Sequence, residues 1–176
     1  MAEGNTAPFF DITIDASTKE SLNQGCIEVL SHVRPNWPSG EVQLKIFTDG
    51  LTNKLVGGWH EDKKDLVLIR IYGEDTDKFI DRDNEKKNMK MMELGGCGSK
   101  LYAAFKNGLS YEFLHGKVLE PSMLFDPKIY REVDKCLAKM HKVKIEASSV
   151  SMWDFLEKLI KLYPEKFSDT NKVYPL

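Results

Sequence analysis

Apolar and polar residues alternate through the middle of the chain in a pattern that is typical of β-strands. Five segments share this pattern: 42–47, 54–59, 66–72, 100–105 and 109–114. Turn-forming pairs, Asp49-Gly50 and Asn107-Gly108, join the first two and the last two of these segments. The β-branched and aromatic residues of 9–14 predict one further short strand ahead of them.

Apolar residues three and four positions apart mark four other segments as helices. These segments are 18–33, 77–94, 127–141 and 152–163. Thr18 and Asp126-Pro127 are residue types that start helices, and Ser151-x-x-Asp154 has the spacing of a capping box. Five strands with one helix inserted after the third predict an α+β fold, in which that helix covers a twisted antiparallel sheet.

Composition and charge narrow the range of partners. The 176 residues are 41% hydrophobic and 30% charged, as in ordinary globular proteins, and their formal net charge is -2. We therefore expect no nucleic-acid partner, because proteins of that class carry a basic excess. No apolar run approaches the ~18 residues of a spanning helix, and the N-terminus lacks the pattern of a signal peptide. We expect neither membrane insertion nor secretion.

The cysteines point to a reducing compartment. Cys26, Cys97 and Cys136 are odd in number, lie far apart in the chain and form no C-x-x-C motif. This excludes a disulfide framework and a structural zinc site of the usual spacing. Free thiols are typical of the cytosol, so we expect a cytoplasmic protein.

Arg70 is the first residue whose chemistry stands out. On a strand it shares one face with Leu66, Leu68 and Tyr72, and a guanidinium in such a run needs an anionic partner because burying an unpaired charge is costly. In the acidic segment that follows, only Glu85 lies on the same helical stripe as two methionines. A strand Arg paired with a helix Glu matches the phosphate-holding ion pair of kinases, although an ordinary ion pair also fits these residues.

Two further segments have residues that suit a nucleotide. The loop 48–54 contains Gly50, Thr52 and Asn53, and such a loop can present backbone N–H groups and small polar side chains to phosphate oxygens. The strand 109–114 leads into a glycine-containing connector, which can hydrogen-bond adenine through main-chain atoms. Each segment also fits a simpler interpretation, as a plain hairpin and as an edge strand.

The order of these features is that of a protein-kinase-like small lobe, and the residues themselves resemble the choline/ethanolamine kinase family over about 42–163. Five ordered motifs carry the resemblance: Thr48–Leu55, Val67–Gly73, Asp81–Glu85, Leu109–Gly116 and Leu137–His141. The motifs are closer to the ethanolamine-phosphorylating members. Choline-phosphorylating members usually differ in the loop and carry a Gln-Phe-type connector where this chain has Tyr111-Glu112-Phe113.

The resemblance implies a role for each matching residue. Arg70 takes the place of the strand lysine of protein kinases and contacts the phosphates of ATP, with Glu85 as its helix partner. Gly50, Thr52 and Asn53 belong to the loop that covers the phosphates. ATP with Mg²⁺ is therefore the expected cofactor, and ethanolamine is the expected substrate of the complete enzyme.

The resemblance also implies that the chain has three parts. Glu112 and Leu114 delimit the segment that contacts adenine through main-chain atoms. Residues 41–116 form the nucleotide-binding small lobe and its hinge, after a leader strand and helix in 1–40. Residues 117–176 form the helical start of an incomplete large lobe.

The catalytic segments of the family have no match in this chain. These are a His-x-Asp-x-x-x-x-Asn segment and an Asp-x-Glu segment that holds Mg²⁺. His60-Glu61-Asp62 is a partial match, but Val67 stands where the Asn belongs, so we interpret it as a solvated turn. We therefore expect no catalytic and no metal-binding residue here, and a chain that is the amino-terminal part of a larger kinase and is inactive alone.

Three functions fit this sequence. The favoured one is transfer of the γ-phosphoryl group of ATP to ethanolamine, the first step of phosphatidylethanolamine synthesis. A choline kinase fragment is an alternative, because the alcohol pocket of the family lies in the large lobe. A non-catalytic short form that acts as a binding or regulatory module is another. In each case the apolar stripes of 127–141 and 152–163 are left bare, so we expect self-association.

Overall fold

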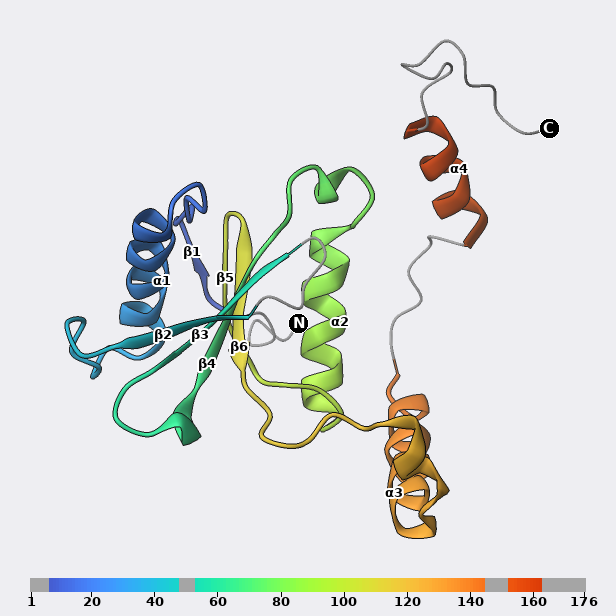
Figure 1. Cartoon of the computed structure of the whole chain (residues 1–176). Coiled ribbons are helices and arrows are strands. Elements are labelled where there is room, and N and C mark those ends of the chain that lie inside the picture. The colour runs from blue at the N-terminus through green and yellow to red at the C-terminus, as the bar shows by residue number, and fades with distance from the viewer. Residues whose placement is uncertain (1–6, 48–52, 145–151, 163–176) are drawn as a thin grey trace, which may run out of the picture.

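A sheet with one helix on each face forms the body of the protein (Figure 1). The computed structural model describes residues 7–47, 53–144 and 152–162. Helix α1 (Lys19–Val33) covers one face of the sheet and α2 (Arg82–Leu94) covers the other. The strands are β1 (Phe9–Phe10), β2 (Gln43–Phe47), β3 (Lys54–Trp59), β4 (Val67–Ile71), β5 (Leu101–Phe105) and β6 (Gly108–Glu112).

The strand order confirms the expected α+β fold and adds a strand to it. The sheet has six strands in the order β1-β5-β6-β4-β3-β2, and every pair is antiparallel except β1 with β5. The expected sheet of five antiparallel strands is therefore extended at one edge into a mixed sheet. The expected strand 9–14 is a strand only at its first two residues, Phe9 and Phe10.

The rest of the leader stays beside β5 through other hydrogen bonds. The backbone N–H of Lys106 donates to the Ile12 carbonyl over 3.0 Å. The Asn107 side chain then accepts from the Ile14 N–H over 2.9 Å and donates to the Ile14 carbonyl over 2.8 Å. The side-chain amide continues the pairing because β5 has already ended at Phe105 and the chain turns at Lys106 and Asn107.

Capping residues set where the helices begin. The Thr18 hydroxyl accepts from the Ser21 N–H, as predicted for the start of α1. The expected helix 77–94 begins only at Arg82, because the Asp81 carboxylate accepts from two N–H groups of the first turn. Thr76–Lys78 forms a separate 3-10 turn, η2, and two further turns are η1 (Lys63–Asp65) and η3 (Pro121–Phe125).

The two faces of β4 have different neighbours, as the period of two predicts. Val67, Ile69 and Ile71 are buried in a core shared with α1. The α1 side chains of that core are Leu22, Cys26, Val29 and Leu30. Leu68 and Arg70 lie on the opposite face, toward α2. The sheet thus separates an apolar core from a face that carries charge.

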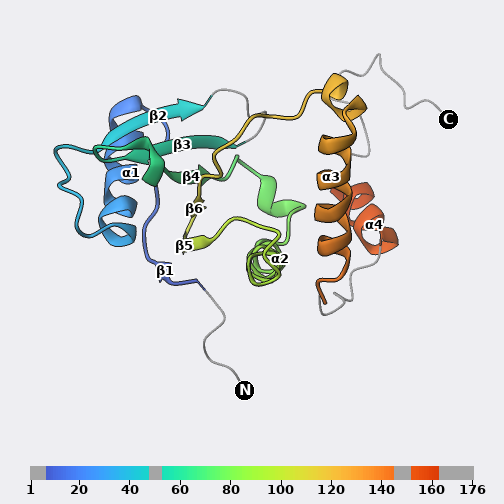
Figure 2. The same cartoon turned by 90° about the horizontal axis from the view of Figure 1, so that it is seen from below.

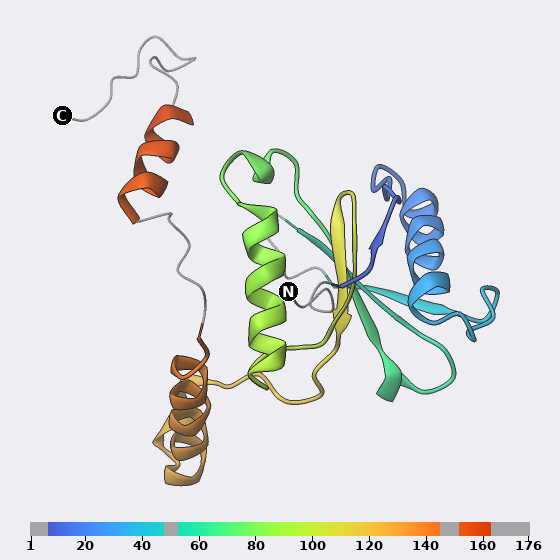
Figure 3. The same ribbon diagram turned by 180° about the vertical axis from the view of Figure 1, so that it is seen from behind.

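The last helices stand apart from this body. Figures 2 and 3 show α3 (Pro127–His141) and α4 (Met152–Leu162) beyond α2, on the side away from the sheet. None of the residues of these two helices is buried, which agrees with the expected bare stripes. Among the described helices, none combines the length and the apolarity that a membrane span requires.

Candidate functional site

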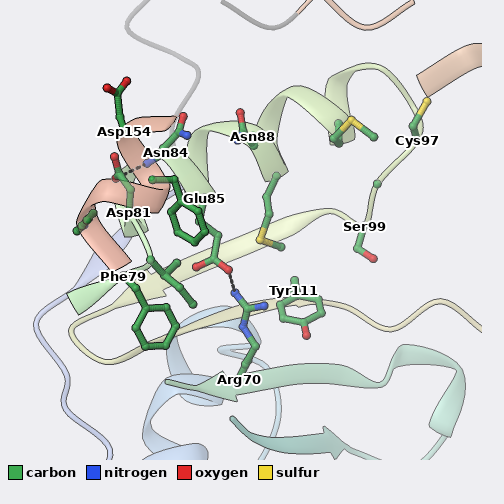
Figure 4. A pocket seen from close by; sticks show the side chains of 16 residues that line it. Arg70, Phe79, Asp81, Asn84, Glu85, Asn88, Cys97, Ser99, Tyr111 and Asp154 are labelled. Atoms are coloured by element: carbon green, nitrogen blue, oxygen red, sulfur yellow. Dashed lines mark hydrogen bonds and ion pairs between the residues drawn. The ribbon is translucent and has the colours of Figure 1, made fainter. Parts of the chain in front are cut away.

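The predicted ion pair between Arg70 and Glu85 is present. Arg70 lies on β4, which β3 and β6 flank on both sides, and its Nη2 is 2.6 Å from Oε1 of Glu85 on α2 (Figure 4). Both side chains are about a quarter exposed, at 22% and 23%. The two residues therefore meet between the sheet and the helix, partly shielded from water.

A glycine fixes how closely the strands approach at this point. Gly108 pairs with Ile71, and a Cβ atom at this position would collide with the backbone oxygen of Arg70. Gly108 was expected in the turn, but it is the first residue of β6, where its lack of a side chain has a packing role. It lets β6 lie against the backbone of the strand that carries the guanidinium.

Arg82 joins the pair, a contact that sequence reasoning missed. Its Nη1 is 2.9 Å from Oε2 of Glu85, and its guanidinium lies 3.7 Å from the centre of the Tyr72 ring. Its Nη2 also donates to the hydroxyl of Thr76, which is buried. The spacing of three residues between Arg82 and Glu85 on one helix is the signal that could have revealed this contact.

At the ion pair itself, cationic groups outnumber carboxylates. One carboxylate, Glu85, faces two guanidinium groups, those of Arg70 and Arg82. The rings of Tyr72 and Tyr111 lie 5.8 and 6.0 Å from the Arg70 guanidinium. Burial raises the pKa of both phenols, Glu85 adds to the rise and Arg70 opposes it, so both rings stay neutral at physiological pH. The arrangement suits an anion.

A cavity of about 970 Å³ opens next to this pair. Arg70, Glu85 and Tyr111 line it together with the apolar side chains Phe79, Met89 and Met92, and with Asp154, Phe155 and Lys158 of α4. Figure 4 shows the Arg70 and Glu85 side chains pointing toward each other at its floor. The cavity therefore carries charge both at the Arg70–Glu85 pair and at α4, and apolar side chains make up much of the rest of its lining.

The predicted phosphate-covering loop is only partly described. Gly50 and Thr52 lie outside the described residues. Asn53 is described, and its Oδ1 accepts from the Gly73 N–H over 3.4 Å. This bond holds Asn53, the residue before β3, beside the residues that follow β4.

The predicted base-binding segment begins at the end of β6. The backbone N–H of Glu112 donates to the Lys100 carbonyl over 2.9 Å, and its carboxylate accepts from the Lys100 N–H over 3.1 Å. Glu112 is the last residue of β6, so these contacts hold the end of that strand beside Lys100. The exposed Leu114 follows after the strand has ended.

An apolar cluster extends from Arg70 toward that segment. Its members are Trp59, Leu66 and Leu68, with the partly buried Phe47, Leu55, Tyr111 and Phe113 packed against them. The rings of Phe47 and Phe113 stack with centroids 6.5 Å apart. This face of the sheet therefore offers an apolar surface next to a cationic one.

The partial match to a catalytic segment is a turn, as interpreted. Glu61 has a left-handed backbone with φ 53, and the Asp62 side chain caps the η1 turn. His60 Nε2 is 2.9 Å from the Glu41 carboxylate. In the described part of the chain, no three Asp, Glu, His or Cys side chains come together as a metal site.

Comparison with known proteins decides the family. A sequence profile described as Choline/ethanolamine kinase matches residues 44–174. The chain belongs to the choline/ethanolamine kinase family. Mouse (Mus musculus) "Ethanolamine kinase 1" is 37% identical over 168 residues, which are 93% of this chain and 46% of that protein. Human (Homo sapiens) "Ethanolamine kinase 2" is 38% identical over 141 residues, 80% of this chain and 36% of that protein.

Solved structures agree with the fold of the family. The chain is similar to an ethanolamine kinase from Plasmodium vivax, with a TM-score of 0.63, 26% identity, and coverage of 77% of this chain and 38% of the other. A choline kinase from Cryptosporidium parvum matches with a TM-score of 0.59 and 24% identity, over 72% of this chain and 37% of that one, and shows the fold alone. The chain spans less than half the length of these relatives.

Proposed function

We propose that this chain is the nucleotide-binding part of an ethanolamine kinase. The reaction is transfer of the γ-phosphoryl group of ATP to the hydroxyl group of ethanolamine, in the cytoplasm, as the first step of phosphatidylethanolamine synthesis. The observation that carries the proposal is the Arg70–Glu85 ion pair at the floor of the cavity. An ion pair of this kind, between a strand cation and a helix glutamate, holds the ATP phosphates in protein kinases.

The surroundings of the pair support the assignment of each part of ATP. The phosphates contact Arg70, whose guanidinium is a planar fork suited to phosphate oxygens. The loop with Gly50, Thr52 and Asn53 covers them. The base lies against the apolar cluster beside Leu68 and Phe113 and contacts main-chain atoms of the segment from Glu112 to Leu114.

The choice of ethanolamine over choline rests on the relatives. The mouse and human relatives that match most of this chain are both named as ethanolamine kinases. The residues that the structure describes include no cluster suited to Mg²⁺, so we assign no magnesium ligand to this part of the chain. We expect the chain alone to produce no phosphoethanolamine when supplied with ATP, Mg²⁺ and ethanolamine.

Calorimetric titration of the chain with ATP and with adenosine tests the proposal. Replacing Arg70 with Lys should preserve the fold and adenosine binding but weaken ATP binding roughly ten- to a hundredfold, because a charged bidentate contact is lost. Arg131→Lys, on the exposed face of α3, is the matched control and should bind ATP as the wild type does. Equal ATP affinity in the Arg70 variant and the wild type would contradict the proposal.

A further inference from the structure

We infer that Arg82 is a positioning residue, which acts through Glu85 to keep Arg70 available to phosphate groups. The inference rests on the proposed function and adds to it a residue that does not touch the nucleotide. Arg82 is not among the residues that line the cavity, whereas Arg70 and Glu85 both are. Arg82 therefore makes no direct contact with a ligand in this cavity, and its contact with the lining is through Glu85.

Glu85 divides its two carboxylate oxygens between the two arginines. Oε1 lies 2.6 Å from Nη2 of Arg70, and Oε2 lies 2.9 Å from Nη1 of Arg82. Arg70 is therefore held through one oxygen rather than by the two-bond fork that an arginine and a carboxylate readily form. Its Nε is buried and makes no hydrogen bond within the described residues, so the fork is incomplete on the Arg70 side as well.

Arg82 is itself held firmly in place. Its guanidinium stacks 3.7 Å from the Tyr72 ring centre, and it donates to the Thr76 hydroxyl. Thr76 is 3% exposed, and its hydroxyl in turn donates to the Gly73 carbonyl over 2.8 Å. These contacts come from the turn between β4 and α2, so Arg82 fixes the orientation of Glu85 before any ligand arrives. Preorganisation of this kind lowers the cost of binding.

Loss of Arg82 should change the contacts that the Glu85 carboxylate makes. The freed oxygen Oε2 can then turn onto Arg70, which completes the fork and neutralises the guanidinium more fully. The cation would be held in an arrangement that competes with phosphate. The effect should fall on the phosphates alone, because the apolar cluster proposed for the base does not include Arg82.

Titration of the whole chain with ATP and with adenosine tests the inference. Arg82→Gln should weaken ATP binding roughly ten- to a hundredfold, as loss of a supporting residue does at other charged sites, and leave adenosine binding unchanged. Arg82→Lys, which keeps one cationic donor for Glu85, should restore part of the ATP affinity. Thr76→Val, a milder change to the same support, should move ATP affinity in the same direction, and Arg131→Gln on α3 serves as control.

A double variant separates positioning from direct contact. When Glu85 is already Gln, Arg82→Gln should have little further effect on ATP affinity, since the residue through which it acts has lost its charge. Equal effects in the two backgrounds would overturn the inference, because they indicate that Arg82 touches phosphate itself. Equal loss of ATP and adenosine binding would also overturn it, as the sign of a purely structural role.

The outcomes distinguish this inference from the proposed function. If Arg70→Lys weakens ATP binding and Arg82→Gln does not, the proposed function stands and the positioning role is wrong. If the wild-type chain binds ATP no better than adenosine, the proposed function fails and this inference fails with it. Urea unfolding of each variant confirms that the compared proteins are folded.

Discussion

Helices α1 and α4 are both amphipathic, yet only α1 has a buried face. Five residues of α1 are buried: Leu22, Gly25, Cys26, Val29 and Leu30. In α4, Trp153 is 70% exposed and Ile160 is 71% exposed. The difference lies in the partner, because α1 lies on the apolar face of the sheet while α4 only contributes to the rim of the cavity. An apolar stripe predicts a helix, but its residues are buried in a core only where another apolar surface packs against them.

The largest expected effect is a difference in lost unfolding free energy between a buried position beside α1 and an exposed position on α3. Ile69, fully buried between the sheet and α1, should cost about 2–5 kcal/mol of unfolding free energy when changed to Ala. Leu137→Ala on α3 should cost less than about 0.5 kcal/mol, because this side chain is 44% exposed. Urea unfolding measures both. A similar cost at the two positions would show that α3 is covered in solution.

A second test uses the thiol at the centre of the α1 core. Burial raises the pKa of Cys26 from 9.0 to about 12. Above pH 9 the unfolded chain releases this proton while the folded chain keeps it, so the folded state binds more protons and stability falls as pH rises. The unfolding free energy should fall by about 1.4 kcal/mol per pH unit between pH 9 and 11.

The exposed Cys136 supplies the control for that test. Cys26→Ala should flatten the fall in unfolding free energy that begins near pH 9, whereas Cys136→Ala should leave it as in the wild type. The raised pKa values of Tyr72 and Tyr111 add to the loss of stability in the same direction above about pH 10. An unchanged slope in the Cys26 variant would mean that the thiol titrates in the folded protein as in the unfolded one.

The next prediction compares the unfolding free energy lost when an ion pair is broken in the body of the protein and in the outlying helix α3. Glu85→Gln leaves two partly buried guanidinium groups without their anion and should cost about 1–3 kcal/mol, less than for a fully buried pair because water still reaches the site. Glu132→Gln removes the partner of Lys135 on the exposed face of α3 and should cost less than about 0.5 kcal/mol. Thermal or urea unfolding of the two variants gives the comparison.

Changing the exposed apolar residues of α4 should have the smallest effect on the unfolding free energy and the largest effect on self-association. We expect the wild-type chain to self-associate through the bare faces of α3 and α4, as exposed apolar patches generally do. Changing Trp153 and Ile160 to Glu should shift the chain toward monomer in sedimentation velocity, with almost no change in the unfolding free energy. A wild-type chain that stays monomeric at high concentration would show that these faces do not drive association.

Local residue patterns were sufficient to predict much of the fold and the centre of the site. Alternation located the strands of the main sheet, and Thr18 and Asp126 marked helix starts because capping depends on neighbouring residues alone. The face shared by Leu68 and Arg70 follows from the period of a strand. The partner Glu85 follows from the period of a helix, because it lies four and seven residues before Met89 and Met92. Asp81 has the same phase, but its carboxylate caps the start of α2.

Tertiary structure decided what depends on residues far apart in the chain. The parallel pairing of Phe9 and Phe10 with β5 joins segments whose patterns carry no mark of each other. The engagement of the Glu112 amide with Lys100 is likewise set by strand register. The position of Arg82 is also set by tertiary contacts. Its stacking on Tyr72 and its hydrogen bond to Thr76 require the η2 turn to fold back against α2. Hydrophobic period and capping are local properties, whereas a shared carboxylate and a covered helix face exist only once distant segments have packed together.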